Sequence, residues 1–222
     1  LSQVASSAML SSLNVMIATL EVSRYTWNAR LIGSMLTIPV TPIEDANPQT
    51  LQRVRDELQD LLPMLGHCAI SYFTPQATTV REILAWVHVN EQRWRQRVDV
   101  LIIDYADKLA PEGKKDTGSS YEGMRDVYEK LRIWAEQNGT WVFTAAQAKG
   151  KGQSNKVRRT DVDDVADSMH KSRVCDLMVT IDMTETHGVR EVSMFVAKNR
   201  LGPSRFIVGP LPVAFEVGRL IY

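Results

Sequence analysis

Val98-Asp-Val-Leu-Ile-Ile-Asp104 is the stretch that decides the fold, because apolar residues run without interruption from Val100 to Ile103 and stop at an acidic side chain. A short continuous apolar run of this kind is typical of a strand that is buried on both faces. A rigid strand that ends in a carboxylate can hold an acidic group beside a metal-bound water, as a Mg-nucleotide site requires. The run therefore predicts a parallel sheet with Asp104 at its functional edge.

Two further apolar runs end in the same way. Asn14-Val-Met-Ile-Ala-Thr-Leu20 stops at Glu21, and Trp141-Val-Phe-Thr-Ala-Ala146 stops at Gln147. Because ligands of an open parallel sheet bind beyond the carboxyl ends of its strands, Glu21, Asp104 and Gln147 are expected to point at one crevice. Each of them alone is as well explained as an ordinary polar residue at a strand end, but the three together favour a site.

Helical and strand-like segments alternate over two-thirds of the chain and then give way to strands and turns. Helices are expected at 1–12, 24–35, 51–62, 78–97, 121–138 and about 163–173, and strands at 14–20, 67–73, 98–103, 141–146, 176–183, 191–197 and 205–208. Ser23 and either Thr78 or Thr79 are expected to cap helices, and Pro48 is assigned to a loop. This order predicts an α/β fold: a mostly parallel sheet flanked by helices, with an antiparallel C-terminal extension at one edge.

The composition bounds the size and the class of the protein. Its 222 residues, 44% of them hydrophobic and 23% charged, fit one globular domain, which we place at residues 1–222. The formal net charge of zero argues against a wholly basic surface but allows a local basic groove. No run is long enough to span a membrane, and no signal peptide is visible. Cys68 and Cys175 each stand alone and are expected to be reduced.

A phosphate-binding loop of the form G-x-x-x-x-G-K-[ST] does not occur in the sequence. The Gly-Lys pairs at Gly113-Lys114 and Gly150-Lys151 lie in polar stretches, not between a strand and an apolar helix. The chain also opens on Leu1 inside a helical pattern that has no capping residue. Together these features predict an N-terminally truncated domain.

Four sequence elements occur in a fixed order: Ile17-Ala-Thr-Leu-Glu-Val-Ser23, Val100-Leu-Ile-Ile-Asp-Tyr-Ala-Asp-Lys-Leu109, Trp141-Val-Phe-Thr-Ala-Ala-Gln147 and Ala197-Lys-Asn-Arg-Leu-Gly-Pro203. In this order they resemble the C-terminal motor domain of DnaB-type replicative helicases, which belong to the RecA-like ATPases. The resemblance runs over nearly the whole chain, although residues 36–76 carry little of it. It implies a RecA-like core, with the family's phosphate loop (Walker A) directly before the helix that begins at Leu1.

The resemblance also implies ATP and Mg²⁺ as cofactors and assigns roles by position. Glu21 would be the general base that orients the attacking water, Asp104 would bind Mg²⁺ through a water, and Gln147 would sense the γ-phosphate. Lys198 and Arg200 would reach the nucleotide of a neighbouring subunit as an arginine finger pair, and loss of such a finger lowers the rate by about 10³–10⁵. From the residues alone, Lys198 and Arg200 are more readily a solvated strand end before a turn.

Two basic, glycine-bearing segments follow the strands that end at Asp104 and Gln147. Their cationic residues are Lys114 and Lys115 in the first segment and Lys149, Lys151, Lys156, Arg158 and Arg159 in the second. Flexible cations suit backbone phosphates, and the lack of aromatic residues between them predicts sequence-neutral contacts. The resemblance implies that both segments face a central channel and bind single-stranded DNA, whereas the residues alone also allow two solvated surface loops.

The function implied by the resemblance is that of a hexameric ring that hydrolyses ATP between subunits, translocates on single-stranded DNA and unwinds duplex DNA. Its partners would be further copies of itself and, through regions outside this sequence, primase and a helicase loader. The protein would be located in the cytoplasm of a bacterium, or in that of the bacterial host if it is a phage or plasmid protein. Two alternatives stay open: a RecA-type recombinase that forms filaments, and a P-loop-less subunit that binds nucleic acid or serves in assembly.

Several other polar residues are given no catalytic role. The four histidines lack the spacing of metal ligands with each other or with cysteine, so no zinc site is expected. Asp107 could assist Asp104 but is assigned as a loop cap. Lys171 and Arg173 could contact a neighbouring subunit but are assigned by default to a solvated helix face.

Overall fold

The parallel sheet forms the centre of the molecule. The structure, a computed structural model, describes residues 1–39, 47–112, 120–147, 171, 173–186, 189–214 and 219–220. The sheet has the strand order β2-β1-β3-β4, in which the strands are β1 (Val15–Thr19), β2 (Cys68–Tyr72), β3 (Val100–Asp104) and β4 (Trp141–Thr144). All neighbouring pairs are parallel, and each strand lies within the segment that the sequence predicted, except that β3 extends one residue further, to Asp104.

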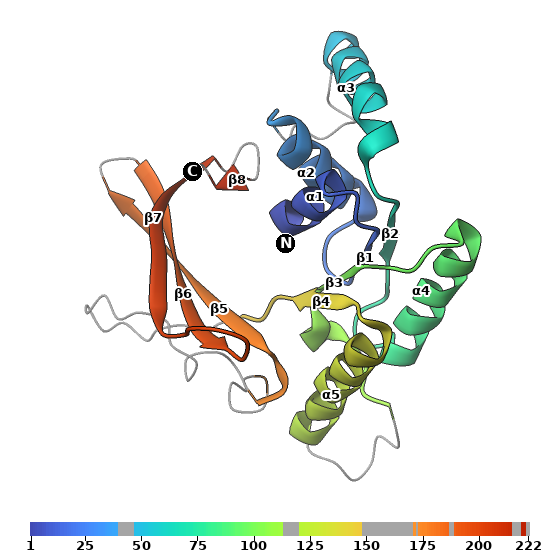
Figure 1. Ribbon diagram of the computed structural model, residues 1–222, viewed down its shortest axis with the longest axis vertical. Helices are drawn as coiled ribbons and strands as arrows, with labels where there is room; N and C mark the ends of the chain where they lie inside the picture. The colour runs from blue at the N-terminus through green and yellow to red at the C-terminus, as the bar shows by residue number, and fades with distance from the viewer. Residues whose placement is uncertain are drawn as a thin grey trace.

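Helices cover both faces of this sheet (Figure 1). Alternate residues of β1 and β3 divide the core, because successive side chains of a strand point to opposite faces. The residues Val15, Ile17, Val100 and Ile102 pack with α1 (Ser2–Leu10) and α2 (Arg24–Leu36). On the opposite face, Met16, Ala18, Leu101 and Ile103 pack with α4 (Val80–Trp94) and α5 (Ser120–Asn138). The result is the three-layered α/β/α core that the alternating pattern predicted.

Side-chain caps set where the helices begin. The Ser23 hydroxyl accepts a hydrogen bond from the Thr26 amide (3.1 Å) at the start of α2. Of the two candidates for α4, Thr79 is the cap, and it forms a reciprocal capping box with Glu82. The assignment of Pro48 to a loop is wrong: α3 (Pro48–Leu61) begins there, because Asn47 caps the helix and proline is tolerated at its first position.

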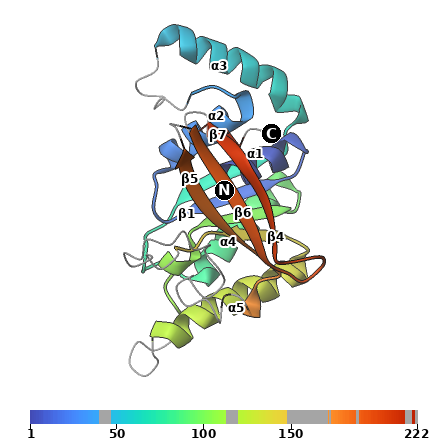
Figure 2. The same cartoon turned by 90° about the vertical axis from the view of Figure 1, so that its left-hand side faces the viewer.

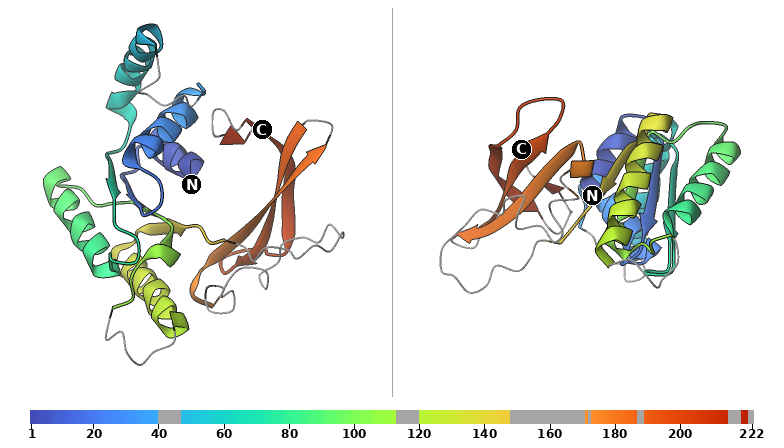
Figure 3. Two further views of the ribbon diagram at one scale, coloured as in Figure 1. Left: turned by 180° about the vertical axis from the view of Figure 1, so that it is seen from behind. Right: turned by 90° about the horizontal axis from the view of Figure 1, so that it is seen from below.

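The C-terminal strands form a second sheet of their own. The strands β5 (Leu177–Thr186), β6 (Val189–Asn199), β7 (Phe206–Ala214) and β8 (Arg219–Leu220) lie in that order and are antiparallel. Figure 2 shows β5, β6 and β7 in front of the core, and the two views of Figure 3 show the same sheet standing to one side of it. The predicted antiparallel extension is confirmed. Within the described residues, however, no strand pair joins the two sheets.

Three short features complete the description. Two 3₁₀ turns, η2 (Leu62–Met64) and η3 (Ala106–Lys108), follow α3 and β3. Gly139, directly after α5, has a φ of +64°, which is the left-handed conformation expected of a C-terminal helix cap. In the part of the chain that the structure describes, no helix is both long and apolar enough to cross a membrane.

Candidate functional site

Glu21, Asp104 and Gln147 follow three adjacent parallel strands. Thr19 of β1 is in register with Asp104 of β3, and the Leu20 amide donates a 2.8 Å hydrogen bond to the Asp104 carbonyl. On the other side of β3, Ile103 is in register with Thr144 of β4, three residues before Gln147. The sheet therefore brings the three strand ends to one edge. Glu21 and Gln147 are exposed there, whereas Asp104 is half-buried.

A buried tryptophan fixes the carboxylate of Asp104. Trp27 lies one turn into α2, is 2% exposed, and donates a hydrogen bond from Nε1 to Asp104 Oδ2 (2.9 Å). Among the described side chains, no donor contacts the other oxygen, Oδ1. Because the indole ring is packed in the core, it has little freedom to release the carboxylate. One oxygen of Asp104 is thus held by the protein, and the second is left for a ligand or water.

Glu21 borders a cleft at the ends of β1 and β2. The cleft has a volume of about 510 Å³ and is lined by Glu21, Ser23, Arg24, Tyr25, Ser71 and Tyr72. Lys108 of η3 lies within electrostatic range of this carboxylate. The pKa of Lys108 is raised first by its hydrogen bond with Tyr105 and by the charge of Tyr105, and in smaller part by Glu21. Glu21 is thus exposed beside the cleft, with the positive charge of Lys108 within electrostatic range.

The first helix begins at the edge of the sheet where Asp104 lies. α1 packs on the same face of β1 and β3 as α2, and only residues 11–14 separate its last residue from the first residue of β1. The N-terminal end of α1 therefore lies at the same edge of the sheet as the three strand-end residues. The free amides and the dipole of a helix N-terminus attract anions, so this edge combines a carboxylate with an anion-attracting helix end.

The donor set can be compared with what Mg²⁺ requires. In the described part of the chain, no group of three or more histidine, cysteine or acidic residues could hold a metal ion by itself. Mg²⁺ does not need such a cage, since it keeps several waters and is usually bound by one or two carboxylates together with substrate phosphates. Asp104, with one oxygen fixed and one open, fits this mode of binding.

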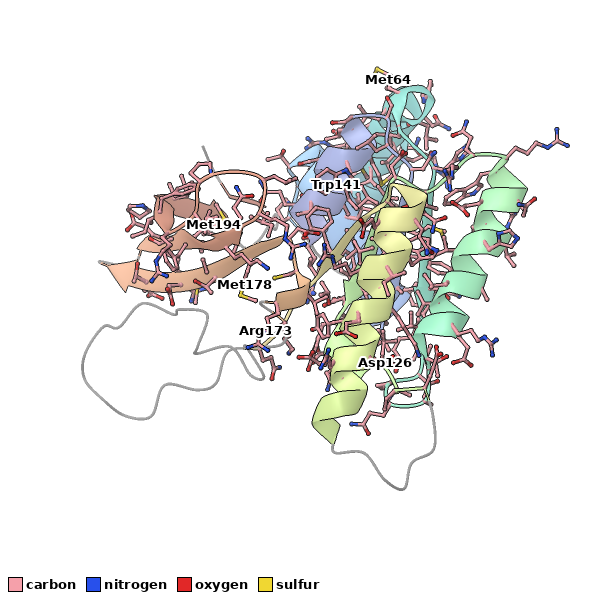
Figure 4. The ribbon with its side chains drawn as sticks, turned by 60° about the horizontal axis from the view of Figure 1, so that its bottom comes forward. Met64, Asp126, Trp141, Arg173, Met178 and Met194 are labelled. Carbon is pink, nitrogen blue, oxygen red and sulfur yellow. The ribbon has the colours of Figure 1, made fainter. Side chains whose placement is uncertain are left out.

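Lys198 lies near the end of β6, and Arg200 directly follows that strand. Lys198 Nζ donates to the Cys175 carbonyl (2.6 Å). The Arg200 guanidinium pairs with Asp176 (Nη1 to Oδ1, 2.7 Å) and also lies 3.4 Å from the Arg173 carbonyl. Figure 4 shows Arg173 just before β5, between the antiparallel sheet and α5. No contact of the described residues joins the pair to Asp104 of the same chain, and their role stays a prediction.

Two assignments from the sequence are wrong. Lys171 is not on a solvated face: it is 4% exposed, and its Nζ pairs with Asp107 Oδ2 at 2.6 Å. Asp107 is not a simple loop cap, because its other oxygen accepts a 2.6 Å hydrogen bond from the Tyr128 hydroxyl. A buried lysine needs a partner, and this partner is far away in the sequence, which explains why local pattern could not reveal the pair. Arg173, in contrast, is exposed as predicted.

The predicted DNA-binding residues, Lys114, Lys115, Lys149, Lys151, Lys156, Arg158 and Arg159, lie outside the described residues. Their role therefore stays a prediction. Neither Cys68 nor Cys175 is in a disulfide.

Sequence reasoning missed two residues at the site, Trp27 and Lys108. One feature of the sequence could have indicated that Trp27 packs against the sheet. It lies one helical turn after the Ser23 cap, on the face of α2 that must pack there. Lys108 was part of a quoted motif, but no feature of the sequence indicated that it would lie within electrostatic range of Glu21.

Comparisons with known proteins agree with this architecture. The profile of the family described as DnaB-like helicase C terminal domain matches residues 1–215. The chain is similar to a structure of a DnaB-like replicative helicase, described with its interactions with primase, at 18% identity and a TM-score of 0.74 over 99% of this chain and 54% of that one. It is also similar to a second solved structure, described as an ATPase domain, at 18% identity and a TM-score of 0.76 over 99% of this chain and 79% of that one. No curated protein sequence matches it.

These two structural likenesses, at 18% identity, show the fold alone. The chain spans about half the length of the first of the two structures, 54% of that chain.

Proposed function

The chain belongs to the DnaB-like helicase C-terminal domain family, and from this premise we propose that it is the ATP-hydrolysing motor domain of a replicative DNA helicase. The observation that carries the proposal is the arrangement of Glu21, Asp104 and Gln147 after three adjacent parallel strands, with the N-terminal end of α1 at the same edge. General base, metal-side carboxylate and γ-phosphate sensor would then occupy neighbouring positions, as phosphoryl transfer requires.

Each of these residues has a distinct role in the proposal. Glu21, exposed beside the cleft, orients the attacking water and accepts its proton. Asp104, held through one oxygen by Trp27, directs its second oxygen at a water of the metal shell. Gln147 lies directly before the second basic segment and reports the state of the phosphates to it. Bound Mg²⁺·ATP would supply the transferable phosphoryl group and the cation that neutralises its charge.

The phosphates need a cradle that the sequence does not contain. We propose that the phosphates bind at the N-terminal end of α1, where free amides and the helix dipole attract anions. The position of that helix end at the same edge as Asp104 supports the proposal, since a phosphate held there would lie next to the metal-side carboxylate.

The remaining residues act between subunits and on DNA. Lys198 and Arg200 reach the nucleotide of the next subunit in a hexameric ring, which makes hydrolysis depend on assembly. The cations of residues 114–115 and 149–159 bind the backbone of single-stranded DNA in the channel. Primase and a helicase loader would bind outside this domain, in the cytoplasm of a bacterium or of a bacterial host.

Steady-state ATP hydrolysis by the full-length protein, with and without single-stranded DNA, tests the proposal. Glu21→Gln and Arg200→Ala are each expected to slow hydrolysis by about 10³-fold, because one removes the base and the other the finger. The matched control is Glu185→Gln, which removes an exposed carboxylate that pairs with Arg190 (3.0 Å) on the antiparallel sheet, and it should change nothing. Absence of hydrolysis in the unmodified protein would instead favour a binding or assembly subunit.

A further inference from the structure

One buried ion pair has no role in the proposed chemistry. Lys171 Nζ lies 2.6 Å from Asp107 Oδ2 and 5.5 Å from the centre of the Tyr128 ring, whose hydroxyl donates to Asp107 Oδ1. Lys171 is 4% exposed. Asp107 belongs to η3, which directly follows the strand that ends in Asp104. The pair therefore attaches the backbone at Lys171 to the functional end of β3.

A second set of bonds joins the same backbone to the finger pair. The Lys171 carbonyl accepts from the Cys175 amide (2.9 Å), and the Cys175 carbonyl accepts from Lys198 Nζ (2.6 Å). Next to it, the Asp176 carbonyl accepts from the Arg200 amide (2.8 Å), and its carboxylate pairs with the Arg200 guanidinium (2.7 Å).

This network has a further support from α5. Arg132 Nη2 lies 3.5 Å from Asp176 Oδ1, so the same carboxylate that holds Arg200 also contacts a helix of the core. Asp176 is about half exposed, and a surface ion pair alone would hold the guanidinium only weakly. The buried anchor at Lys171 is therefore the element that can keep residues 173–176 in place.

We propose that Lys171 is a positioning residue for the arginine finger pair. Through Asp107 it fixes residues 173–176 to the end of β3, and these residues in turn hold Lys198 and Arg200 in the orientation that a neighbouring subunit meets. The inference rests on the proposed function, in which Asp104 serves the nucleotide of its own subunit and Arg200 serves that of the next. A contiguous chain of bonds is a reason to expect coupling, but only a perturbation can demonstrate it.

Hydrogen exchange in the full-length protein tests the anchor without any reference to activity. Lys171→Met keeps much of the side-chain volume and removes the charge. The amides of Cys175 and Arg200, which donate to carbonyls of the anchored segment, should then exchange at least roughly tenfold faster. In the control Lys130→Met, which removes a lysine that is about one-third exposed and paired with Asp126 and Glu112 on the core, both amides should exchange as before. Asp107→Asn, a milder change that keeps the contact with Tyr128, should speed exchange in the same direction.

Hydrolysis by double variants then tests whether the anchor acts through the finger. Lys171→Met should lower kcat with little change in KM, because a finger contributes mainly in the transition state. The double variant Lys171→Met/Arg200→Ala should be no slower than Arg200→Ala alone, whereas a merely structural effect would multiply the two losses. Unchanged exchange at Cys175 and Arg200, or multiplied losses, would overturn the inference. Absence of hydrolysis in the unmodified protein would overturn the proposed function, and the exchange result would still decide the anchor.

Discussion

Replacing Lys171 by methionine should destabilise the protein more than any other single loss of a lysine that the structure describes. The change removes one charge of a pair whose side chains are 5% and 22% exposed, and it leaves the Asp107 carboxylate without its cation. Breaking a buried pair by removing one partner costs about 3–5 kcal/mol. Asp107 keeps the Tyr128 hydroxyl as a donor and has some access to water, so the lower end, about 3 kcal/mol, is expected.

The expected loss is large enough to measure in two ways. In a chain of this size each kcal/mol corresponds to about 2–4 °C, so Tm should fall by about 6–12 °C. Urea unfolding at fixed pH should show the same loss as a lower midpoint with an unchanged slope. The control Lys130→Met breaks ion pairs that are about one-third exposed, for which about 1 kcal/mol or less is expected.

The reasoning fails if Lys171→Met is no less stable than Lys130→Met. It also fails if Lys171→Met/Asp107→Asn shows the simple sum of the two single losses, since residues in direct contact should couple by about 0.5–3 kcal/mol.

Four further predictions rest on contacts elsewhere in the core. Trp27→Phe removes the N–H that binds Asp104 and also shortens the buried ring. Because a hydrogen bond to a charged group is worth about 1.5–3 kcal/mol, kcat for ATP should fall roughly tenfold or more. An unchanged kcat would show that the indole does not position the carboxylate. Thr79→Ala removes the capping box of α4 and should lower the free energy of unfolding by about 1 kcal/mol in urea titrations, whereas no change would mean that the cap is not formed in solution. The hydrogen bonds from Thr79 lower the pKa of Glu82 in the folded protein. The Glu82 carboxylate therefore stabilises the fold above the pKa that it has in the unfolded chain, and this stability is lost as the pH falls through the lower pKa of the folded protein. Tm measured from about pH 6 to pH 3 should accordingly fall less steeply in Glu82→Gln than in the unmodified protein. Burial raises the pKa of the Cys68 thiol to about 12, so iodoacetamide near pH 8 should label Cys68 much more slowly in the native protein than in urea, as read by mass spectrometry.

The layered core could be predicted from the sequence because its signals are local and periodic. The apolar runs before Glu21 and Asp104 lie on both faces of a buried sheet, and their alternate residues divide between the two helical layers as such a strand requires. Ser23 and the pair Thr78 and Thr79, of which the structure selects Thr79, marked helix starts for the same reason, since a cap bonds to an amide only three residues away.

What escaped prediction depends on contacts between segments that are distant in the chain. Asp107 and Lys171 are separated by 64 residues, and each taken alone has the polarity of an exposed side chain. Trp27 and Asp104 are 77 residues apart, and nothing in the sequence indicates that the indole will donate to this carboxylate. Such pairs form only once the sheet order is set, so the pattern of one segment does not contain them.

The placement of the antiparallel strands was predictable only in part. The strand-turn-strand pattern indicated antiparallel pairing of β5, β6 and β7, which the structure confirms. Whether these strands join the parallel sheet depends on which strand pairs with β4. The hydrophobic periodicity of a segment does not predict which strand it pairs with. The roles of Glu21, Asp104, Gln147, Lys198 and Arg200 stay predictions, carried by the family and by their positions.

Strand separation on a forked DNA duplex tests the central claim most directly. The full-length protein should release the labelled strand when ATP and Mg²⁺ are present, and it should release none with a non-hydrolysable ATP analogue. Glu21→Gln should bind the fork but fail to separate it, because binding does not need the general base whereas hydrolysis does. Failure of the unmodified protein to separate the strands, or equal separation by Glu21→Gln, would contradict the account of this domain as an ATP-driven motor on DNA.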